Sequence, residues 1–166
     1  MDMALILATI KKARGGRVYP SSGLPVVRSG EVLPDDLRTF YELCGGVELF
    51  SYADYPISIV PPQSMKPANS IILIGLTEEE LADPKYDASN SWYIISDEGS
   101  GQYITIDTNP RRLGYCYDSF WDIHPLNSTI ISYSFTELLL KFLHDRGEVF
   151  YKDEWKLLGR VYDPDF

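Results

Sequence analysis

Histidine and cysteine are scarce in this sequence of 166 residues, which contains two of each. His124 and His144 stand apart, and neither belongs to a His-x-x-x-His or Cys-x-x-Cys pair, so we predict no metal site. Cys44 and Cys116 lie in apolar stretches, which is typical of buried free thiols. We expect no disulfide, because no export signal is recognisable in the sequence.

Long apolar runs are also missing, since no segment approaches the ~20 apolar residues that a membrane-spanning helix needs. A short apolar run at residues 3–8 follows Asp2 and precedes Lys11 and Lys12. A signal peptide has the opposite order, with basic residues before its apolar run and small residues after it. We therefore expect an amphipathic helix here, and a cytoplasmic protein that does not bind a membrane.

Positive charge is deficient in one part of the chain only. Residues 1–75 have seven acidic and seven basic residues, whereas residues 76–166 have 17 acidic and 8 basic residues and carry the whole net charge of −9. An acidic surface disfavours nucleic acid, whose phosphates need Lys and Arg. It favours a basic protein partner, because complementary potentials speed encounter and reject wrong partners. Acidity can also serve solubility alone, and composition does not separate these two roles.

Motifs that carry catalysis are absent as well. The sequence has no phosphate-binding Gly-x-x-x-x-Gly-Lys-Ser/Thr loop, no Gly-x-Gly-x-x-Gly unit between strand and helix, and no Gly-x-Ser-x-Gly nucleophile elbow. A pair of catalytic carboxylates would escape such a search, because it needs a defined separation in space. Glu98, Asp118 and Asp122 are the carboxylates to inspect for it. We expect no catalytic residues and no cofactor, and we keep an unrecognised enzyme or small-ligand binder as an alternative.

Several segments have the pattern of helices. The clearest begins near Pro34, which suits a first helical turn, and ends at Gly45 and Gly46. Other helices are predicted for residues 3–14, for a short segment from residue 77 to before Pro84, and for residues 134–147. The last two open with capping-box spacing. The helix after Pro34 has one apolar face, formed by Leu37, Phe40, Tyr41 and Cys44.

Strand-like runs occupy much of the rest of the chain. Residues 102–107 alternate between Ile and polar residues, which indicates a strand with one buried face. Residues 97–101 contain two glycines and read as a hairpin turn; they lack the ligand pattern of a calcium loop. The tail, residues 149–162, is expected to add an edge strand. A mainly antiparallel sheet with helices packed on it, an α+β fold, is therefore predicted. The predicted strands are residues 47–50, 57–60, 71–74, 92–96, 102–107 and 113–118.

Residues 118–122 read Asp-Ser-Phe-Trp-Asp and are predicted to form a loop. A loop that exposes Trp121 beside carboxylates would make a good hot spot for protein binding. Alternatively, Phe120 and Trp121 pack into the core and the loop is purely structural.

The order and spacing of these motifs resemble the SMI1/KNR4 family, also called the SUKH superfamily. Leu33-Pro34-Asp35-Asp36-Leu37, followed by Phe40-Tyr41 and Cys44-Gly45-Gly46, resembles the opening motif of that family. The resemblance covers about residues 30–145, and each piece alone is a common helix or hairpin signal. It continues in residues 92–95, 97–101, 103–107, 114–120 and 134–139.

The resemblance implies a single domain over residues 1–166, with a twisted sheet of about six strands backed by helices. Bacterial members of the family are typically immunity proteins that bind a toxin domain, often a nuclease, and block it inside the producing cell. Fungal members resemble regulatory scaffolds in cell-wall signalling. Neither group has an established catalytic site. The matching positions expected to determine the fold are Pro34, Gly45, Gly46, Trp92, Gly101, Gly114 and Phe135.

On this resemblance we expect an immunity protein that neutralises a cognate toxin, a basic nuclease of a bacterial polymorphic or contact-dependent toxin system. The alternative is a non-catalytic regulatory module with a non-toxin partner. An acidic surface can occupy the cationic cleft of a nuclease. We expect a monomer or a weak homodimer, since a free sheet edge near the C-terminus permits pairing. The candidate partner-binding residues are Glu98, Asp107, Asp118, Trp121 and Asp122.

Overall fold

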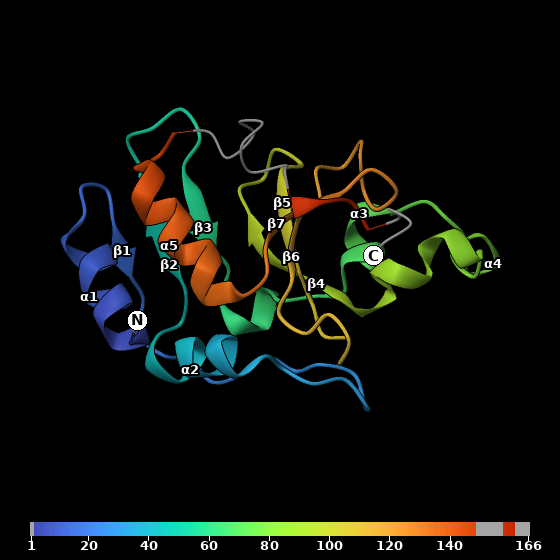
Figure 1. The fold of residues 1–166 in the computed structure, drawn as a ribbon, viewed down its shortest axis with the longest axis horizontal. Coiled ribbons are helices and arrows are strands. Elements are labelled where there is room, and N and C mark those ends of the chain that lie inside the picture. The colour runs from blue at the N-terminus through green and yellow to red at the C-terminus, as the bar shows by residue number, and fades with distance from the viewer. Residues whose placement is uncertain (1, 149–157, 162–166) are drawn as a thin grey trace.

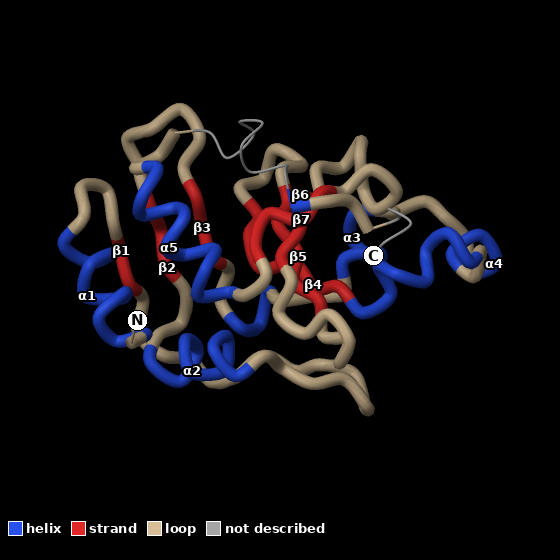
Figure 2. The backbone as a smooth tube through the Cα atoms, viewed as in Figure 1, coloured by secondary structure: helices blue, strands red, loops and turns tan. Residues whose placement is uncertain are grey.

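Seven strands lie side by side in one antiparallel sheet in the computed structural model, which describes residues 2–148 and 158–161. The strands follow chain order across the sheet, so each one pairs with its neighbours in sequence (Figures 1 and 2). The α+β class and the mainly antiparallel sheet are thus confirmed. The strands are β1 (Arg17–Val18), β2 (Val47–Leu49), β3 (Ile57–Ile59), β4 (Trp92–Asp97), β5 (Tyr103–Asp107), β6 (Cys116–Asp118) and β7 (Thr129–Ser132).

Helices precede the sheet in the chain, lie between β1 and β2 and between β3 and β4, and follow β7. Figure 1 shows α1, α2 and α5 towards the end of the molecule that carries β1–β3, and α4 at the opposite end. The helices are α1 (Met3–Lys12), α2 (Asp35–Leu43), η1 (Pro62–Ser64), α3 (Ala68–Ile72), α4 (Glu78–Leu81), η2 (Pro84–Ser91) and α5 (Phe135–Asp145).

The sheet has a core on each face, and β4 supplies both. Tyr93 and Ile95 belong to the larger core, which also contains the buried faces of α1, α2 and α5. Trp92 and Ile94 belong to a smaller core on the other side, with Ala68 of α3. Alternate residues of a strand point to opposite faces, so the four consecutive apolar residues that begin β4 are covered on both sides.

The turn from α2 into β2 explains why two glycines follow this helix. Gly46 has a φ of +123°, which side chains with a Cβ rarely adopt. A Cβ on Gly45 would lie 2.2 Å from the carbonyl oxygen of Pro20. The glycines therefore end the helix. They also leave room for the segment that follows β1, which passes close to Gly45 at Pro20. Pro34 stands at the N-cap, one residue before the first helical residue.

Caps at the later helices follow the sequence pattern in one case and depart from it in the other. At α4, Thr77 and Glu80 form the complete capping box. At α5, the Ser134 side chain accepts a hydrogen bond from the Glu137 N–H, whereas the Glu137 carboxylate accepts one from the Tyr133 N–H. The reciprocal half of the second box is therefore shifted by one residue.

The strand predicted for residues 71–74 is wrong. Ile71 and Ile72 close the short helix α3, and Ile74 follows it with 84% of its surface exposed. The helix begins directly after Pro67 and buries Ala68 and Asn69, which pack it against β4 and η2. Because the apolar run does not alternate with polar residues, its sequence did not distinguish a strand from a helix.

Two strands, β1 and β7, were not expected, and the face of β5 that was expected to be exposed is buried. β1 consists of two residues in a segment predicted to be a loop, and all four residues of β7 are buried although they include Thr and Ser. Thr105 and Asp107 were expected to face outward on β5, but both are 0% exposed because the second core covers them. The sheet has seven strands, where about six were expected.

The edge strand predicted in the tail lies mostly outside the described residues. Among the residues that are described, Arg160 forms an antiparallel bridge with Thr129, and the Ile130 N–H donates to the carbonyl of Gly159 at 2.9 Å. No helix within residues 2–148 and 158–161 has the length and apolar character to span a membrane.

Candidate protein-binding surface

The turn between β4 and β5 places Glu98 at the tip of a hairpin. The Asp97 carboxylate accepts a hydrogen bond from the Gly99 N–H at 2.8 Å, and the Ser100 hydroxyl donates to the Glu98 carboxylate at 2.7 Å. Local hydrogen bonds thus shape this turn, as Asp and Ser side chains commonly do in tight turns. Among the described residues, no group of three or more His, Cys, Asp or Glu side chains is arranged to hold a metal ion.

Trp121 lies against this hairpin turn. Its backbone N–H donates to the Gly101 carbonyl at 3.1 Å, and a Cβ on Gly101 would lie 2.6 Å from the Trp121 ring. Gly101 also has a φ of +85°. The glycine therefore permits the close approach that holds the loop of residues 119–122 beside the hairpin turn of residues 97–101.

The structure decides between the two readings of the aromatic pair in this loop. Trp121 is 57% exposed, Asp122 is exposed, and Phe120 is half-buried with its ring 5.8 Å from the Trp121 ring. An aromatic side chain that exposes more than half of its surface beside a carboxylate is available to a partner. Glu98, Trp121 and Asp122 thus lie around one hairpin turn.

Asp118 and Asp107 do not lie on this accessible surface. Asp118 is 5% exposed, and its carboxylate accepts hydrogen bonds from the Phe120 N–H at 3.2 Å and from the Gln102 side chain at 3.4 Å. Asp107 is 0% exposed. Both carboxylates were candidates for direct contact with a partner, and burial among neighbouring groups makes them structural instead.

The Asp107 carboxylate is the centre of a buried polar network at the end of β5. Its nearest charged partner is the Arg112 guanidinium at 2.8 Å. A buried carboxylate needs such partners, because its desolvation is otherwise costly. The sequence shows an Asp at a strand end before an Asn-Pro turn, but not its burial. Its five hydrogen-bond donors are the Ser91 hydroxyl, the Trp92 indole N–H, the Asn109 backbone N–H, the Arg112 Nε and the Tyr117 hydroxyl.

An acidic groove of about 400 Å³ opens beside the hairpin turn. β3 and β4 pair at one position, Ile59 with Ser96, so the parts of the strands beyond it are free to border a groove. Glu48 of β2 reaches its rim and accepts a hydrogen bond from the Tyr19 hydroxyl at 2.5 Å. Sequence reasoning missed Glu48, because it lies in the part of the chain that has no net charge. The lining residues are Glu48, Leu49, Ser51, Pro56, Ile57, Ser58, Asp97 and Glu98.

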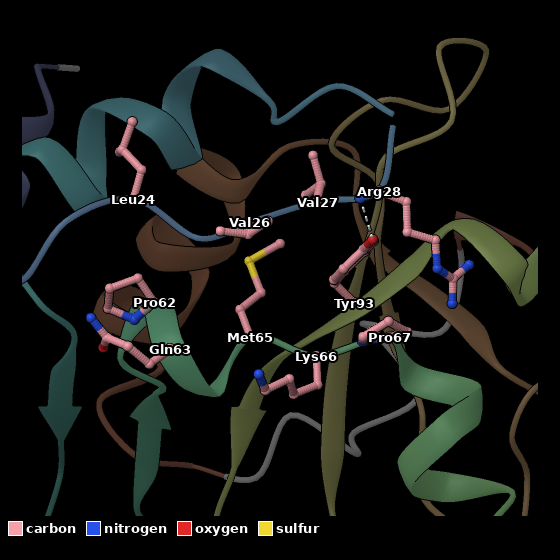
Figure 3. A pocket seen from close by; sticks show the side chains of 10 residues that line it. All are labelled: Leu24, Val26, Val27, Arg28, Pro62, Gln63, Met65, Lys66, Pro67 and Tyr93. Atoms are coloured by element: carbon pink, nitrogen blue, oxygen red, sulfur yellow. Dashed lines mark hydrogen bonds between the residues drawn. The ribbon is translucent and has the colours of Figure 1, made fainter. Parts of the chain in front are cut away.

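A second groove, of about 500 Å³, is mainly apolar and lies near the start of β4 (Figure 3). One wall is the segment of residues 24–28, and the opposite side is formed by η1, the residues that follow it and Tyr93. No motif in the sequence pointed to this groove, because its walls come from segments about 40 residues apart.

Both cysteine thiols and one of the two imidazoles, that of His124, are buried here, whereas His144 is exposed. Burial raises the pKa of the Cys44 thiol to about 11 and also raises that of Cys116. Burial lowers the pKa of His124 to about 3, and its Nε2 lies 2.9 Å from the Asn69 side-chain oxygen. Both thiols and this imidazole are therefore neutral at pH 7, inside the fold and away from both grooves.

Comparisons with known proteins agree with the motif pattern. A profile of the SMI1/KNR4 family (SUKH-1) matches residues 28–141. The immunity protein YokJ of Bacillus subtilis (strain 168) is 40% identical over 167 aligned residues, which cover 98% of this chain and 97% of YokJ. No solved structure matches the chain.

Proposed function

Because the chain belongs to the SMI1/KNR4 family (SUKH-1), we propose that it is an immunity protein that binds and neutralises a cognate toxin domain. The observation that carries this proposal is the 40% identity to an immunity protein over almost the full length of both chains. The aligned region spans the surface loops as well as the core, and loops carry binding function.

We place the toxin contact on the acidic hairpin surface, which we define as Glu48, Asp97, Glu98, Trp121 and Asp122. An exposed Trp at the centre of a polar rim is a common arrangement at protein interfaces, where Trp is enriched among hot spots. The carboxylates around it supply a negative potential. This set keeps three of the residues expected from sequence and replaces the two buried ones with Glu48 and Asp97.

The toxin that fits this surface is a basic nuclease. An enzyme that cleaves nucleic acid needs a cationic cleft for phosphates. Carboxylates on a protein surface are attracted to such a cleft, and this attraction speeds association. The net charge of −9 likewise favours a positively charged partner.

The test is binding of the toxin domain encoded beside the gene for this chain, inactivated at its active site and measured by calorimetry at several salt concentrations. The double variant Glu98→Lys/Asp122→Lys is expected to weaken binding by about tenfold or more and to flatten its salt dependence, because it reverses two charges at the contact. Loss of Trp121 in Trp121→Ala is expected to weaken binding by a similar factor.

The matched control is Asp35→Lys/Glu42→Lys, which reverses two exposed acids on α2 and changes the net charge from −9 to −5, as the test variant does. Equal losses of binding in the two double variants would show that net charge, and not the acidic hairpin surface, determines the affinity. If the toxin domain does not bind the wild-type chain, the proposed function itself is wrong.

A further inference from the structure

The apolar groove is closed on one side by a segment that is fixed at both of its ends. At one end, the Gln63 side chain donates to the Ser22 carbonyl at 2.8 Å. At the other, the Arg28 N–H donates to the Tyr93 hydroxyl at 3.0 Å, and this hydroxyl donates in turn to the Glu31 carboxylate. The wall is therefore held in place before any partner arrives (Figure 3).

Between these two anchors the segment has the burial pattern of a strand. Pro25 is buried and Val27 is half-buried, whereas Leu24 is 41% and Val26 85% exposed. Inward and outward positions alternate with a period of two, as in an extended chain. Outward positions of a surface strand are normally polar, so two aliphatic residues there are unusual for a surface that faces only water.

The backbone of the same segment has unused hydrogen-bonding capacity. Within the described residues, the backbone C=O groups of residues 23–27 and the N–H groups of residues 23, 24, 26 and 27 make no hydrogen bond; Pro25 has no N–H. An extended peptide that lies along such a segment can pair with its backbone and insert alternate side chains into the adjoining groove. A small molecule offers no comparable row of donors and acceptors.

The opposite side of the groove sets the chemistry of the peptide. Met65 and Pro62 are buried and give it an apolar floor. Lys66 is exposed at the rim, and no carboxylate among the described residues forms an ion pair with it. A segment with an aliphatic side chain over Met65 and a carboxylate near Lys66 would satisfy both features.

We propose that this groove binds an extended apolar segment of the toxin that carries an acidic residue, as a contact separate from the acidic hairpin surface. This inference rests on the proposed function. Tyr93 lies near the start of β4 and Asp97 at its end, about 13 Å apart along an extended strand. One partner of ordinary interface size can span that distance. A second copy of this chain fits less well, because each copy carries a net charge of −9.

The test compares Val26→Asp with Ile74→Asp in binding to the same inactivated toxin domain. These two β-branched residues are 85% and 84% exposed, so neither change disturbs the core, and both add one negative charge. Val26→Asp is expected to weaken binding by about tenfold or more, and Ile74→Asp by less than about twofold. Lys66→Glu is expected to weaken binding by a smaller factor than Val26→Asp, because the ammonium group is solvated.

Hydrogen–deuterium exchange and peptides give independent readouts. The amides of Leu24, Val26 and Val27 are expected to exchange more slowly in the complex than in the free chain. Among overlapping peptides that span the toxin domain, one with an acidic residue beside apolar residues is expected to bind the wild type and not Val26→Asp.

The outcomes separate this inference from the proposed function. Unchanged binding by Val26→Asp to a toxin domain that binds the wild type would overturn the groove proposal alone, as would equal losses in Val26→Asp and Ile74→Asp. Unchanged binding by Lys66→Glu would overturn its acidic part. A toxin domain that binds neither wild type nor variants would overturn both proposals.

Discussion

At the scale of single residues, Asp107 is the polar group on which the smaller core depends. Five donors point at its two oxygens, including the indole of Trp92 and the guanidinium of Arg112. In Asp107→Asn one oxygen becomes an NH₂ group that faces donors, and Arg112 loses its counter-charge. We expect a loss of about 3 kcal/mol or more in the free energy of unfolding, measured by urea denaturation.

The matched control for this change is Asp122→Asn, which alters an exposed carboxylate by the same atoms. It is expected to change the free energy of unfolding by less than about 0.5 kcal/mol. Similar small effects in both variants would mean that the network contributes little to stability.

His124 gives the stability of the protein a dependence on acid pH. Burial lowers its pKa from the ordinary 6.5 to about 3. Below pH 6.5 the imidazole is therefore protonated in the unfolded chain but stays neutral in the folded chain. The unfolded state then binds more protons, and stability falls as the pH decreases from 6.5 towards 3, by up to about 1.4 kcal/mol per pH unit from this group.

The variant His124→Gln removes the titrating ring and keeps a donor for the Asn69 side chain. Urea denaturation between pH 7 and pH 4 is expected to show a smaller decrease in stability than in the wild type. Identical slopes would show that other groups cause the acid sensitivity.

Some residue roles were readable in the sequence and others were not. Glycines and acids in residues 97–101 indicated the hairpin turn correctly, because turn geometry is local. The exposure of Trp121 and the burial of Asp107 were not readable, since both depend on which distant segment covers the residue. Two acids of the same run, Asp118 and Asp122, differ in this way: Asp118 is buried and Asp122 is exposed.

At the scale of elements, the start of α5 is capped from another helix. The Asp36 carboxylate of α2 accepts a hydrogen bond from the Thr136 N–H at 2.7 Å, in addition to the cap that Ser134 provides. A negative charge at a helix N-terminus is favourable, and loss of a capping side chain typically costs about 1 kcal/mol. We expect Asp36→Ala to lower the free energy of unfolding by about this amount.

The control for this cap is the neighbouring change Asp35→Ala, at an exposed residue of the same helical turn whose carboxylate makes no hydrogen bond to α5 within the described part of the chain. Thermal denaturation of the two variants separates the interhelical cap from a general effect of acids in the first turn of α2. Equal melting temperatures for the two would contradict it.

Helices were easier to predict than strands for a physical reason. The residues that form the apolar stripe of α2, and those that cap α4, lie within a few positions of one another in the chain, so local sequence specifies both features. β1 has two residues, and β7 is buried on both faces, so neither shows the alternation of a half-buried strand. Their pairing partners decide that they are strands.

At the scale of the whole molecule, charge is distributed unevenly from one end to the other. α1 and β1 carry basic residues, whereas α4 and η2, at the opposite end in Figure 1, carry most of a dense acidic group. Such a separation orients a charged partner before contact. The basic residues are Lys11, Lys12, Arg14 and Arg17, and the acidic residues are Glu78, Glu79, Glu80, Asp83 and Asp87.

We expect the acidic end to act on the rate of association and not on the lifetime of the complex. In the variant Glu78→Gln/Glu79→Gln/Asp87→Asn, the association rate with the toxin domain should fall several-fold at low salt, while the dissociation rate stays the same. Stopped-flow measurements at low and high salt check this. A faster dissociation would place these side chains inside the interface.

We propose that this chain protects a cell from a toxin by binding it. The most direct measurement is growth of a host that expresses the active toxin domain from the adjacent gene, with and without this chain. We expect the chain to restore growth, and we expect Trp121→Ala or Glu98→Lys/Asp122→Lys to protect less at equal expression. Growth arrest that the wild-type chain does not relieve, although it is folded and abundant, would contradict the claim.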